Sequence, residues 1–239
     1  MKGRRPGPLD ERGGSISVAT GTGPARGNEP LPSATMWRPL AAAAVGYLAG
    51  TFPSAELAVA AATHGEIDVH DAGTGNPGAL NTSQAIGKTW GLAVLVADVG
   101  KGALAARAGT VIGGANGAHI AASSAVIGHC YPVWYRFRGG KGVATSIGQV
   151  LATFPVYLPI DVAVGSVAAA IPGWKRRTFA ATATASVAWV TASVIWWRRR
   201  WPNLWGPEPT AALPVAAAIS SATIIVRFLQ EGVEEIPAE

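Results

Sequence analysis

Apolar runs that approach the length of a transmembrane helix occupy most of the chain between residues 39 and 229. A helix rises about 1.5 Å per residue, so about 20 apolar residues cross a hydrocarbon core of about 30 Å. Hydrophobic residues make up 49% of the 239 residues and charged residues only 14%, against about 25% charged in an average soluble domain. Several of the nine tryptophans lie near the ends of these runs, where interfacial anchors occur. The sequence therefore predicts an all-α integral membrane protein, a polytopic helix bundle.

About seven membrane segments are expected. The first carries Gly50, Pro53 and Ser54, which predict a kink inside it. The fourth is short and is bounded by Pro155. The stretch 63–89 is expected to be a polar loop. The seven segments are residues 39–62, 90–114, 117–135, 143–154, 156–172, 178–197 and 210–229.

The two ends of the chain differ from the membrane domain of residues 39–230. Residues 1–38 are expected to be a disordered N-terminal extension, because they are rich in Gly, Pro, Arg and Ser and almost lack apolar periodicity. Met36 directly precedes the first apolar run and is an alternative start of the protein. Residues 231–239 form an acidic C-terminal tail. The single cysteine excludes an internal disulfide.

Basic residues are concentrated in a few loops and at the N-terminus, and the net charge is +5. Because they do not form one basic face, the pattern argues against a nucleic-acid partner. With seven segments, the 63–89 loop, the 136–141 loop, the 173–177 turn and the C-terminal tail share one side. The positive-inside rule favours that side as cytoplasmic. The loops with motif-like composition therefore lie on one face, as a single site at a membrane surface requires.

A glycine-rich, cationic stretch follows the third apolar run. Gly139, Gly140 and Gly142 surround Lys141, after two arginines and three aromatic residues. Glycines without Cβ let backbone N–H groups converge on an anion, and a lysine adds a full positive charge. The stretch predicts a cup for a small phosphorylated substrate. A basic loop that only contacts anionic lipid head groups is the alternative.

A second glycine-rich stretch, residues 73–81 (GTGNPGALN), lies in the expected 63–89 loop. Its glycines satisfy the dinucleotide fingerprint G-x-G-x-x-G, which requires a buried strand before it and a helix at its end. Residues 66–70 make a poor strand and Pro77 interrupts the turn, so a dinucleotide site is disfavoured. A phosphate-binding loop remains, with the Thr74 hydroxyl and the Asn76 amide as additional donors.

Two charges, Asp98 and Lys101, fall within the second expected segment at helical i, i+3 spacing. Both are costly in lipid, so they are expected to pair or to face the protein interior, as a structural ion pair or as part of a site. His129 is either a helix-end hydrogen-bonding residue or a site residue. Its neighbour Cys130 points about 100° away on a helix and is better explained as an apolar filler. The histidines show no metal-ligand spacing, and no metal is expected.

Four motifs, taken together and in order, resemble those of the bacterial acyl-phosphate:glycerol-3-phosphate acyltransferases, the PlsY family. They are residues 50–54 (GTFPS), 73–81 (GTGNPGALN), 98–102 (DVGKG) and 128–145 (GHCYPVWYRFRGGKGVAT). The resemblance is strong over about 45–150, weak from 175 onward, and covers no part of 1–38.

This resemblance implies that residues 39–230 form a seven-helix membrane acyltransferase domain in the plasma membrane, with its site open to the cytoplasm. It implies transfer of a fatty acyl group from acyl phosphate to the sn-1 hydroxyl of glycerol 3-phosphate, giving lysophosphatidic acid for phospholipid synthesis. Acyl phosphate is already activated, so catalysis can rest on positioning and charge stabilisation, without an enzymic nucleophile or a cofactor. The implied partners are these substrates and membrane lipids, and a monomer is expected.

The resemblance also carries over the site, residue by residue. Thr74 stands where the family has serine and keeps the hydroxyl, and Lys141 matches the lysine of the family's Gly-Gly-Lys-Gly. The implied catalytic residues are Lys141, Asn76, Thr74 and His129. The implied substrate- and phosphate-binding residues are Gly73, Gly75, Gly78, Asn81, Asp98, Lys101, Gly139, Gly140, Gly142 and Thr178.

Three positions depart from the family pattern. Gln84 and His70 stand where the family has arginine, and Ile224 stands where an asparagine is expected. Losing a phosphate-binding arginine and a polar site side chain could change the substrate or abolish turnover. The alternatives are therefore a catalytically impaired homologue that binds lipid or phosphate, and a small membrane transporter in which Asp98 and Lys101 form an intramembrane relay.

Overall fold

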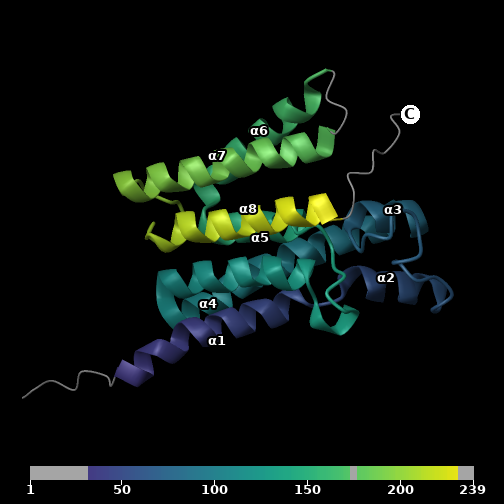
Figure 1. Ribbon diagram of the computed structural model, residues 1–239, viewed down its shortest axis with the longest axis horizontal. Helices are drawn as coiled ribbons and strands as arrows, with labels where there is room; N and C mark the ends of the chain where they lie inside the picture. Colours follow the sequence, from purple (N-terminus) through teal and green to yellow (C-terminus); the bar gives the residue numbers. More distant parts are fainter. Residues whose placement is uncertain (1–31, 173–176, 231–239) are drawn as a thin grey trace, which may run out of the picture.

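The computed structural model describes residues 32–172 and 177–230, and all regular structure in these two ranges is helical (Figure 1). The α-helices are α1 Pro32–Gly50, α2 Ser54–Thr63, α3 Ala79–Ile86, α4 Lys88–Cys130, α5 Val143–Thr153, α6 Leu158–Ala170, α7 Arg177–Arg199 and α8 Ala212–Gln230. Two 3₁₀ turns, η1 Val133–Tyr135 and η2 Pro155–Tyr157, lie between them. The predicted all-α class is confirmed for this part of the chain.

Three of the described helices are long and apolar enough to cross a membrane: α4 with its continuation to Tyr135, α7 and α8. A fourth candidate span arises if α5 and the segment Pro155–Ala170, bent by 117° at their junction, form one broken span. Alone, α5 and α6 have only 11 and 13 residues, short of the roughly 20 that a span needs. The predicted membrane character is supported, whereas seven separate spans are not confirmed.

Helix α4 consists of two arms joined at a kink. Gly113 and Gly114 leave the helical region there, and Gly114 has φ 61°, which glycine adopts without steric cost. The two arms fold back on each other. They approach so closely that a Cβ at Gly109 would lie 2.2 Å from the carbonyl oxygen of Gly117. The kink lies where the sequence predicted the boundary between the second and third segments.

The first expected segment, 39–62, is broken rather than kinked. Helix α1 ends at Gly50 and α2 begins at Ser54. Pro53 has no backbone N–H, and the amide of Ser54 donates to the carbonyl of Phe52 instead of continuing a helix. The ten-residue α2 is consequently outside the candidate spans.

The expectation of a loop throughout 63–89 is also wrong, because residues 79–86 form α3. Its apolar residues Ala79 and Ile86 pack on a buried cluster that includes Val59 of α2 and Val94 of α4. Only eight residues long and rich in Asn, Thr and Ser, α3 has too few turns for its periodicity to be visible in the sequence.

The chain ends lie largely beyond the described ranges. Helix α1 begins at Pro32, inside the extension predicted to be disordered. Residues 1–31 and the acidic tail 231–239 lie outside the described residues, as do residues 173–176 of the basic turn.

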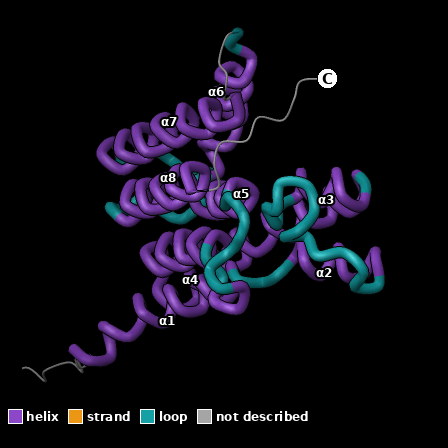
Figure 2. The backbone as a smooth tube through the Cα atoms, turned by 45° about the vertical axis from the view of Figure 1, so that its right-hand side comes forward, coloured by secondary structure: helices purple, strands orange, loops and turns teal. Residues whose placement is uncertain are grey.

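Glycines bring α1, α4 and α5 into backbone contact. A Cβ at Gly46 or Gly50 of α1 would lie 2.1 Å from the carbonyl oxygen of Ala121 or Ala125, respectively, in the second arm of α4. A Cβ at Gly148 of α5 would lie 1.9 Å from the carbonyl oxygen of Val99 in the first arm. Small residues permit such close helix crossings in membranes. The crossings fix α4 between its neighbours, while α2 and α3 lie together at one end of the bundle (Figures 1 and 2).

Candidate active site

A pocket forms beside the break between α1 and α2. Residues from all four sequence motifs contribute to its walls, although these motifs are far apart in the chain. The lining residues are Gly50, Thr51, Phe52, Pro53, Ser54, Glu56, Pro77, Lys101, His129, Pro132, Gly139 and Gly140. The predicted convergence of the motifs is therefore observed.

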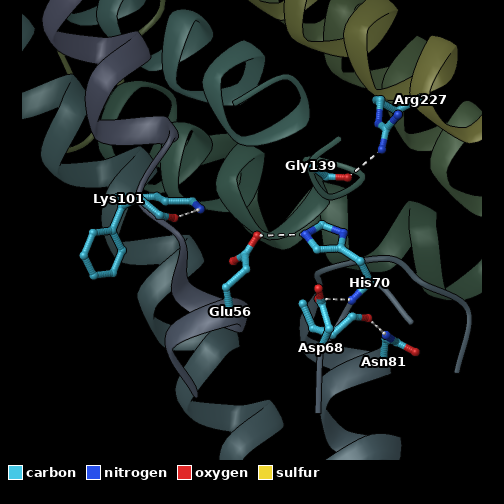
Figure 3. Close-up of polar contacts among 9 residues, drawn as sticks. Glu56, Asp68, His70, Asn81, Lys101, Gly139 and Arg227 are labelled. Atoms are coloured by element: carbon cyan, nitrogen blue, oxygen red, sulfur yellow. Dashed lines mark hydrogen bonds and ion pairs between the residues drawn. The ribbon is translucent and has the colours of Figure 1, made fainter. Parts of the chain in front are cut away.

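A buried ion pair stands at one wall of this pocket. The ammonium nitrogen of Lys101 lies 2.9 Å from Oδ1 of Asp98, and the two side chains are only 7% and 2% exposed. Lys101 also donates to the carbonyl of Phe52 at 3.1 Å, and the Ser54 hydroxyl donates to Asp98. The prediction that both charges pair inside the protein is confirmed. Through its bond to the Phe52 carbonyl, Lys101 joins the α1–α2 break to α4 (Figure 3).

His129 lies between this ion pair and the glycine loop, residues 139–142. Its Nδ1 lies 3.7 Å from Oδ1 of Asp98. A Cβ on Gly140 would lie 2.2 Å from its Nε2, and a Cβ on Gly139 would lie 2.0 Å from its carbonyl oxygen. Glycine is required at both positions because any side chain would displace the imidazole or the end of α4.

The backbone amides of Gly139 and Gly140 are used within the protein. They donate to the carbonyls of Cys130 and His129, each at 3.1 Å. These carbonyls end α4 and lack helical partners, so the glycine loop caps the helix. The predicted cup of converging amides is not formed by these two residues in this conformation.

Arg227 of α8 fastens the glycine loop from its other side. Its Nη2 donates to the carbonyl of Gly139 at 2.5 Å (Figure 3). Its Nε donates to the carbonyl of Gly140 at 3.4 Å. Its guanidinium carbon lies 5.5 Å from the centre of the Tyr131 ring. The sequence offers Arg227 only as one of two possible replacements for the missing arginine, beside the 175–177 turn, and does not place it in the site. A single cation near the end of an apolar helix was the available signal, because such a charge requires a protein partner.

Lys141 lies in the same loop but is not among the lining residues of the pocket. Its ammonium nitrogen is 5.0 Å from the centre of the Phe228 ring, and the side chain is half-buried. Gly142 follows with φ 84° and precedes α5. Cys130 is fully buried in a cluster with Phe228 and Ile224, which confirms the predicted apolar filler.

The loop of residues 73–78 is shaped mainly by Asn81. The Thr74 amide donates to Oδ1 of Asn81 at 2.9 Å, and the Asn81 amide donates to the carbonyl of Ala72 at 2.9 Å. Gly73 and Gly75 have φ 57° and 71°, the left-handed region that favours glycine. Asn81 therefore has a structural role in this conformation.

The remaining residues of this motif lie near the pocket or at the surface. Pro77 lines the pocket, with Asn76 and Gly78 as its chain neighbours. Oδ1 of Asn76 is buried without a hydrogen-bond partner among the described residues, and the Thr74 side chain is exposed. An unpaired buried acceptor beside a pocket is available for a ligand donor.

Other sequence-derived positions lie elsewhere. Thr178 is exposed in the first turn of α7, and Gln84 is exposed on α3. Neither lines the pocket. Ile224 is buried, and a Cβ on Gly142 would lie 3.2 Å from its side chain. The apolar side chain of Ile224 therefore packs against the glycine loop at Gly142.

Glu56 is a pocket residue that the sequence reasoning missed. Its Oε1 lies 3.6 Å from Nε2 of His70 (Figure 3). The centre of the His70 ring lies 5.7 Å from that of the Tyr135 ring. The His70 amide donates to Oδ1 of Asp68 at 2.9 Å. The sequence signal that could have identified Glu56 is its position as a single acidic residue within the first apolar run. In the described ranges, no three His, Cys, Asp or Glu side chains gather as a metal-binding group.

Known proteins resemble this chain over the same region. The family described as "Glycerol-3-phosphate acyltransferase" matches residues 40–234. A glycerol-3-phosphate acyltransferase of Roseobacter denitrificans is 45% identical over 127 residues, which cover 53% of this chain and 60% of the relative. One of Exiguobacterium sibiricum is 45% identical over 112 residues, covering 47% and 53%. The chain thus spans little more than half the length of these curated relatives.

Two solved structures share the fold. They are crystal structures of PlsY, an integral membrane glycerol 3-phosphate acyltransferase, in a glycerol 3-phosphate form and a lysophosphatidic acid form. Their TM-scores are 0.62 and 0.63, each with 28% sequence identity and with coverage of 80% of this chain and 88% of PlsY. With the family match over most of its length, this chain belongs to the glycerol-3-phosphate acyltransferase family.

Proposed function

We propose that this protein transfers a fatty acyl group from acyl phosphate to the sn-1 hydroxyl of glycerol 3-phosphate. The products are lysophosphatidic acid and inorganic phosphate. The observation that carries the proposal is the convergence of all four motifs on one pocket that contains Lys101 and His129. The similar PlsY structures, in a glycerol 3-phosphate form and a lysophosphatidic acid form, support the same acceptor and product.

The pocket suits a reaction between two phosphate-bearing substrates. Lys101 supplies a buried cation, and His129 a ring held in place by the glycine loop. Lys141, Asn76 and Thr74 are proposed to bind phosphoryl oxygens around the pocket. Because acyl phosphate is already activated, fixed charges and close positioning of the hydroxyl can supply the rate enhancement.

The proposal includes the setting of the reaction. We place the protein in the plasma membrane as a monomer that uses no cofactor, with the pocket facing the cytoplasm. The apolar spans and the similar integral membrane PlsY support the membrane location. The basic residues of the 136–141 loop, which shares Gly139 and Gly140 with the pocket, support the cytoplasmic side.

A catalytically impaired homologue is the second candidate, and one observation favours it. The resemblance to the family implies an asparagine at the position of Ile224, which is buried and packs behind Gly142. An isoleucine cannot replace a hydrogen-bonding side chain there. Such a protein would bind substrate phosphate without turnover.

Inorganic phosphate release separates the two candidates. Purified protein in detergent micelles is given acyl phosphate with and without glycerol 3-phosphate. The enzyme reading predicts phosphate release that depends on glycerol 3-phosphate. Saturable binding of glycerol 3-phosphate without that release would support the impaired homologue instead.

Replacing Lys141 with alanine is expected to lower glycerol 3-phosphate-dependent phosphate release by at least about tenfold, because a removed charge-stabilising donor typically costs that much or more. Arg138→Ala is the matched control, since Arg138 is an exposed cation of the same loop. It should retain wild-type turnover. Equal rates for Lys141→Ala and the wild type would exclude Lys141 from the site.

A further inference from the structure

Three consecutive exposed arginines, Arg198 to Arg200, lie at the C-terminal end of α7, on the side of the bundle opposite to the pocket. Helix α8 returns from that side to the glycine loop. Most of its length, about 22 Å at 1.5 Å per residue, separates Ala212 from Arg227. In Figure 1 this end of α7 lies at the left, whereas α2 and α3 lie at the right. The pocket therefore does not account for these charges.

No acidic side chain of the described residues forms an ion pair with the three arginines. The ion pairs in the described ranges join other side chains. Glu208, the single acidic residue in the loop between α7 and α8, is exposed and pairs with none of them. A guanidinium group offers several N–H donors in a planar arrangement that matches phosphate oxygens. The three side chains are thus available to a phosphate-bearing ligand from outside the chain.

Arg200 occupies a backbone position that usually belongs to glycine. Helix α7 ends in a Schellman motif, in which the Arg200 amide donates to the carbonyl of Trp197 at 3.3 Å and the Trp201 amide donates to that of Trp196 at 3.2 Å. The motif requires the left-handed conformation at Arg200, which has φ 51°. A Cβ is strained in that conformation, so glycine is the usual residue.

The helix dipole explains the other two arginines but not this one. Arg198 and Arg199 lie in the last turn of α7, where the partial negative charge of the helix end favours cations. That effect is confined to the last turn, and Arg200 follows it. A strained arginine where glycine would be unstrained indicates a use for its charge.

Tryptophan rings surround the arginines. The centres of the Trp196 and Trp201 rings lie 4.8 Å apart, edge to face, and the guanidinium carbon of Arg198 lies 5.0 Å from the centre of the Trp197 ring. Trp201 and Trp205 are 43% and 59% exposed. Exposed indole rings in membrane proteins prefer the depth of the lipid head groups. The arginines therefore lie at the level of the head-group phosphates.

The loop that carries these tryptophans is anchored to the end of α5. The side-chain amide of Asn203 donates to the carbonyl of Thr153 at 2.9 Å and to that of Pro207 at 2.8 Å. The indole N–H of Trp205 donates to the carbonyl of Leu151 at 2.9 Å. A surface that is already ordered loses little conformational freedom when a ligand binds.

We propose that Arg198, Arg199, Arg200, Trp201 and Trp205, the arginine surface, bind the head group of an anionic phospholipid in the leaflet opposite to the pocket. The guanidinium groups bind the phosphodiester, and the two indole rings lie beside it at the boundary with the acyl chains. This inference is independent of the proposed acyl transfer, because it concerns the other side of the bundle and is tested without turnover.

The test is thermal unfolding of the full chain in neutral detergent micelles. The micelles are titrated with phosphatidylglycerol or with phosphatidylcholine that carries the same acyl chains. A ligand of the folded state raises Tm in proportion to its binding. We expect a saturable rise with phosphatidylglycerol and little change with phosphatidylcholine. Equal rises with the two lipids would overturn the proposal, because the negative charge of the head group would then be irrelevant.

The triple variant Arg198→Gln/Arg199→Gln/Arg200→Gln removes the charges of the arginine surface. Each arginine near an anionic lipid surface contributes about fivefold to binding, so the apparent Kd for phosphatidylglycerol should rise at least about tenfold. Tm without lipid verifies that the variant is folded. An unchanged Kd would overturn the proposal, because the lipid would then bind elsewhere, for instance in the pocket.

The matched control replaces three exposed cations on the pocket side of the bundle: Lys88→Gln, Arg136→Gln and Arg138→Gln. It lowers the net charge by the same amount and should keep the wild-type Kd for phosphatidylglycerol. An equal loss of affinity in both triple variants would contradict the proposal, since binding would then follow the total charge of the protein.

Arg200→Gly separates lipid binding from the folding of the helix end. Glycine relieves the strain at φ 51°, so Tm without lipid should equal or exceed that of the wild type. The apparent Kd for phosphatidylglycerol should nevertheless rise about fivefold. An unchanged Kd in this variant would remove Arg200 from the arginine surface and overturn the reason given for its strained conformation.

Discussion

Replacing Lys101 with methionine is expected to lower the free energy of unfolding by about 3–5 kcal/mol, the usual cost of removing one partner of a buried ion pair. Asp98 is 1% exposed, so its carboxylate would remain inside the protein with the Ser54 hydroxyl and His129 in place of a full positive charge. Lys101 also holds the Phe52 carbonyl, which would lose its donor. Unfolding of the purified protein in detergent micelles measures the change.

The control is Lys88→Met, which removes an exposed lysine from the first position of α4. Its free energy of unfolding should stay within about 0.5 kcal/mol of the wild type. The double variant Asp98→Asn/Lys101→Met removes both charges and should recover much of the loss, because the pair is coupled. If Lys101→Met proved as stable as Lys88→Met, the ion pair would not hold the α1–α2 break to α4.

Adding a single methyl group at Gly46 is expected to destabilise the protein by about 1–3 kcal/mol, the range found for overpacked interiors. The new Cβ would lie 2.1 Å from the carbonyl oxygen and 2.6 Å from Cα of Ala121. Both are backbone atoms, which cannot turn aside as a flexible side chain can. Helix α1 must therefore move away from α4 in Gly46→Ala, and thermal unfolding in micelles should show the loss.

Gly165→Ala provides the matched comparison. Gly165 lies inside α6, and a Cβ there would meet nothing within 4 Å. Alanine is the better helix former by about 1 kcal/mol, so this variant should be as stable as the wild type or more stable. A Gly46→Ala protein that matched Gly165→Ala would show that α1 and α4 do not make the close crossing described here.

The sequence predicted those features whose evidence is local. The i, i+3 spacing of Asp98 and Lys101 within an apolar run predicted their pairing, since neither charge is stable in lipid. Pro155 marked the end of α5, and the boundary after residue 114 corresponds to the kink in α4. Motif order was sufficient to group segments that the fold brings to one pocket.

Features that depend on distant partners could not be predicted in this way. Arg227 donates to Gly139 across 88 residues of chain, and no spacing rule connects these positions. The amides of Gly139 and Gly140 were expected to face an anion, but the open carbonyls at the end of α4 accept them first. Glu56 faces the pocket only because the helix breaks at Pro53, where a continuous kinked segment was predicted.

The most direct measurement is mass spectrometry of the lipid formed by the purified wild-type protein. The account predicts lysophosphatidic acid in amounts that match the inorganic phosphate released, and only when acyl phosphate and glycerol 3-phosphate are both present. No such product, under conditions in which the Roseobacter denitrificans relative forms it, would contradict the acyltransferase function.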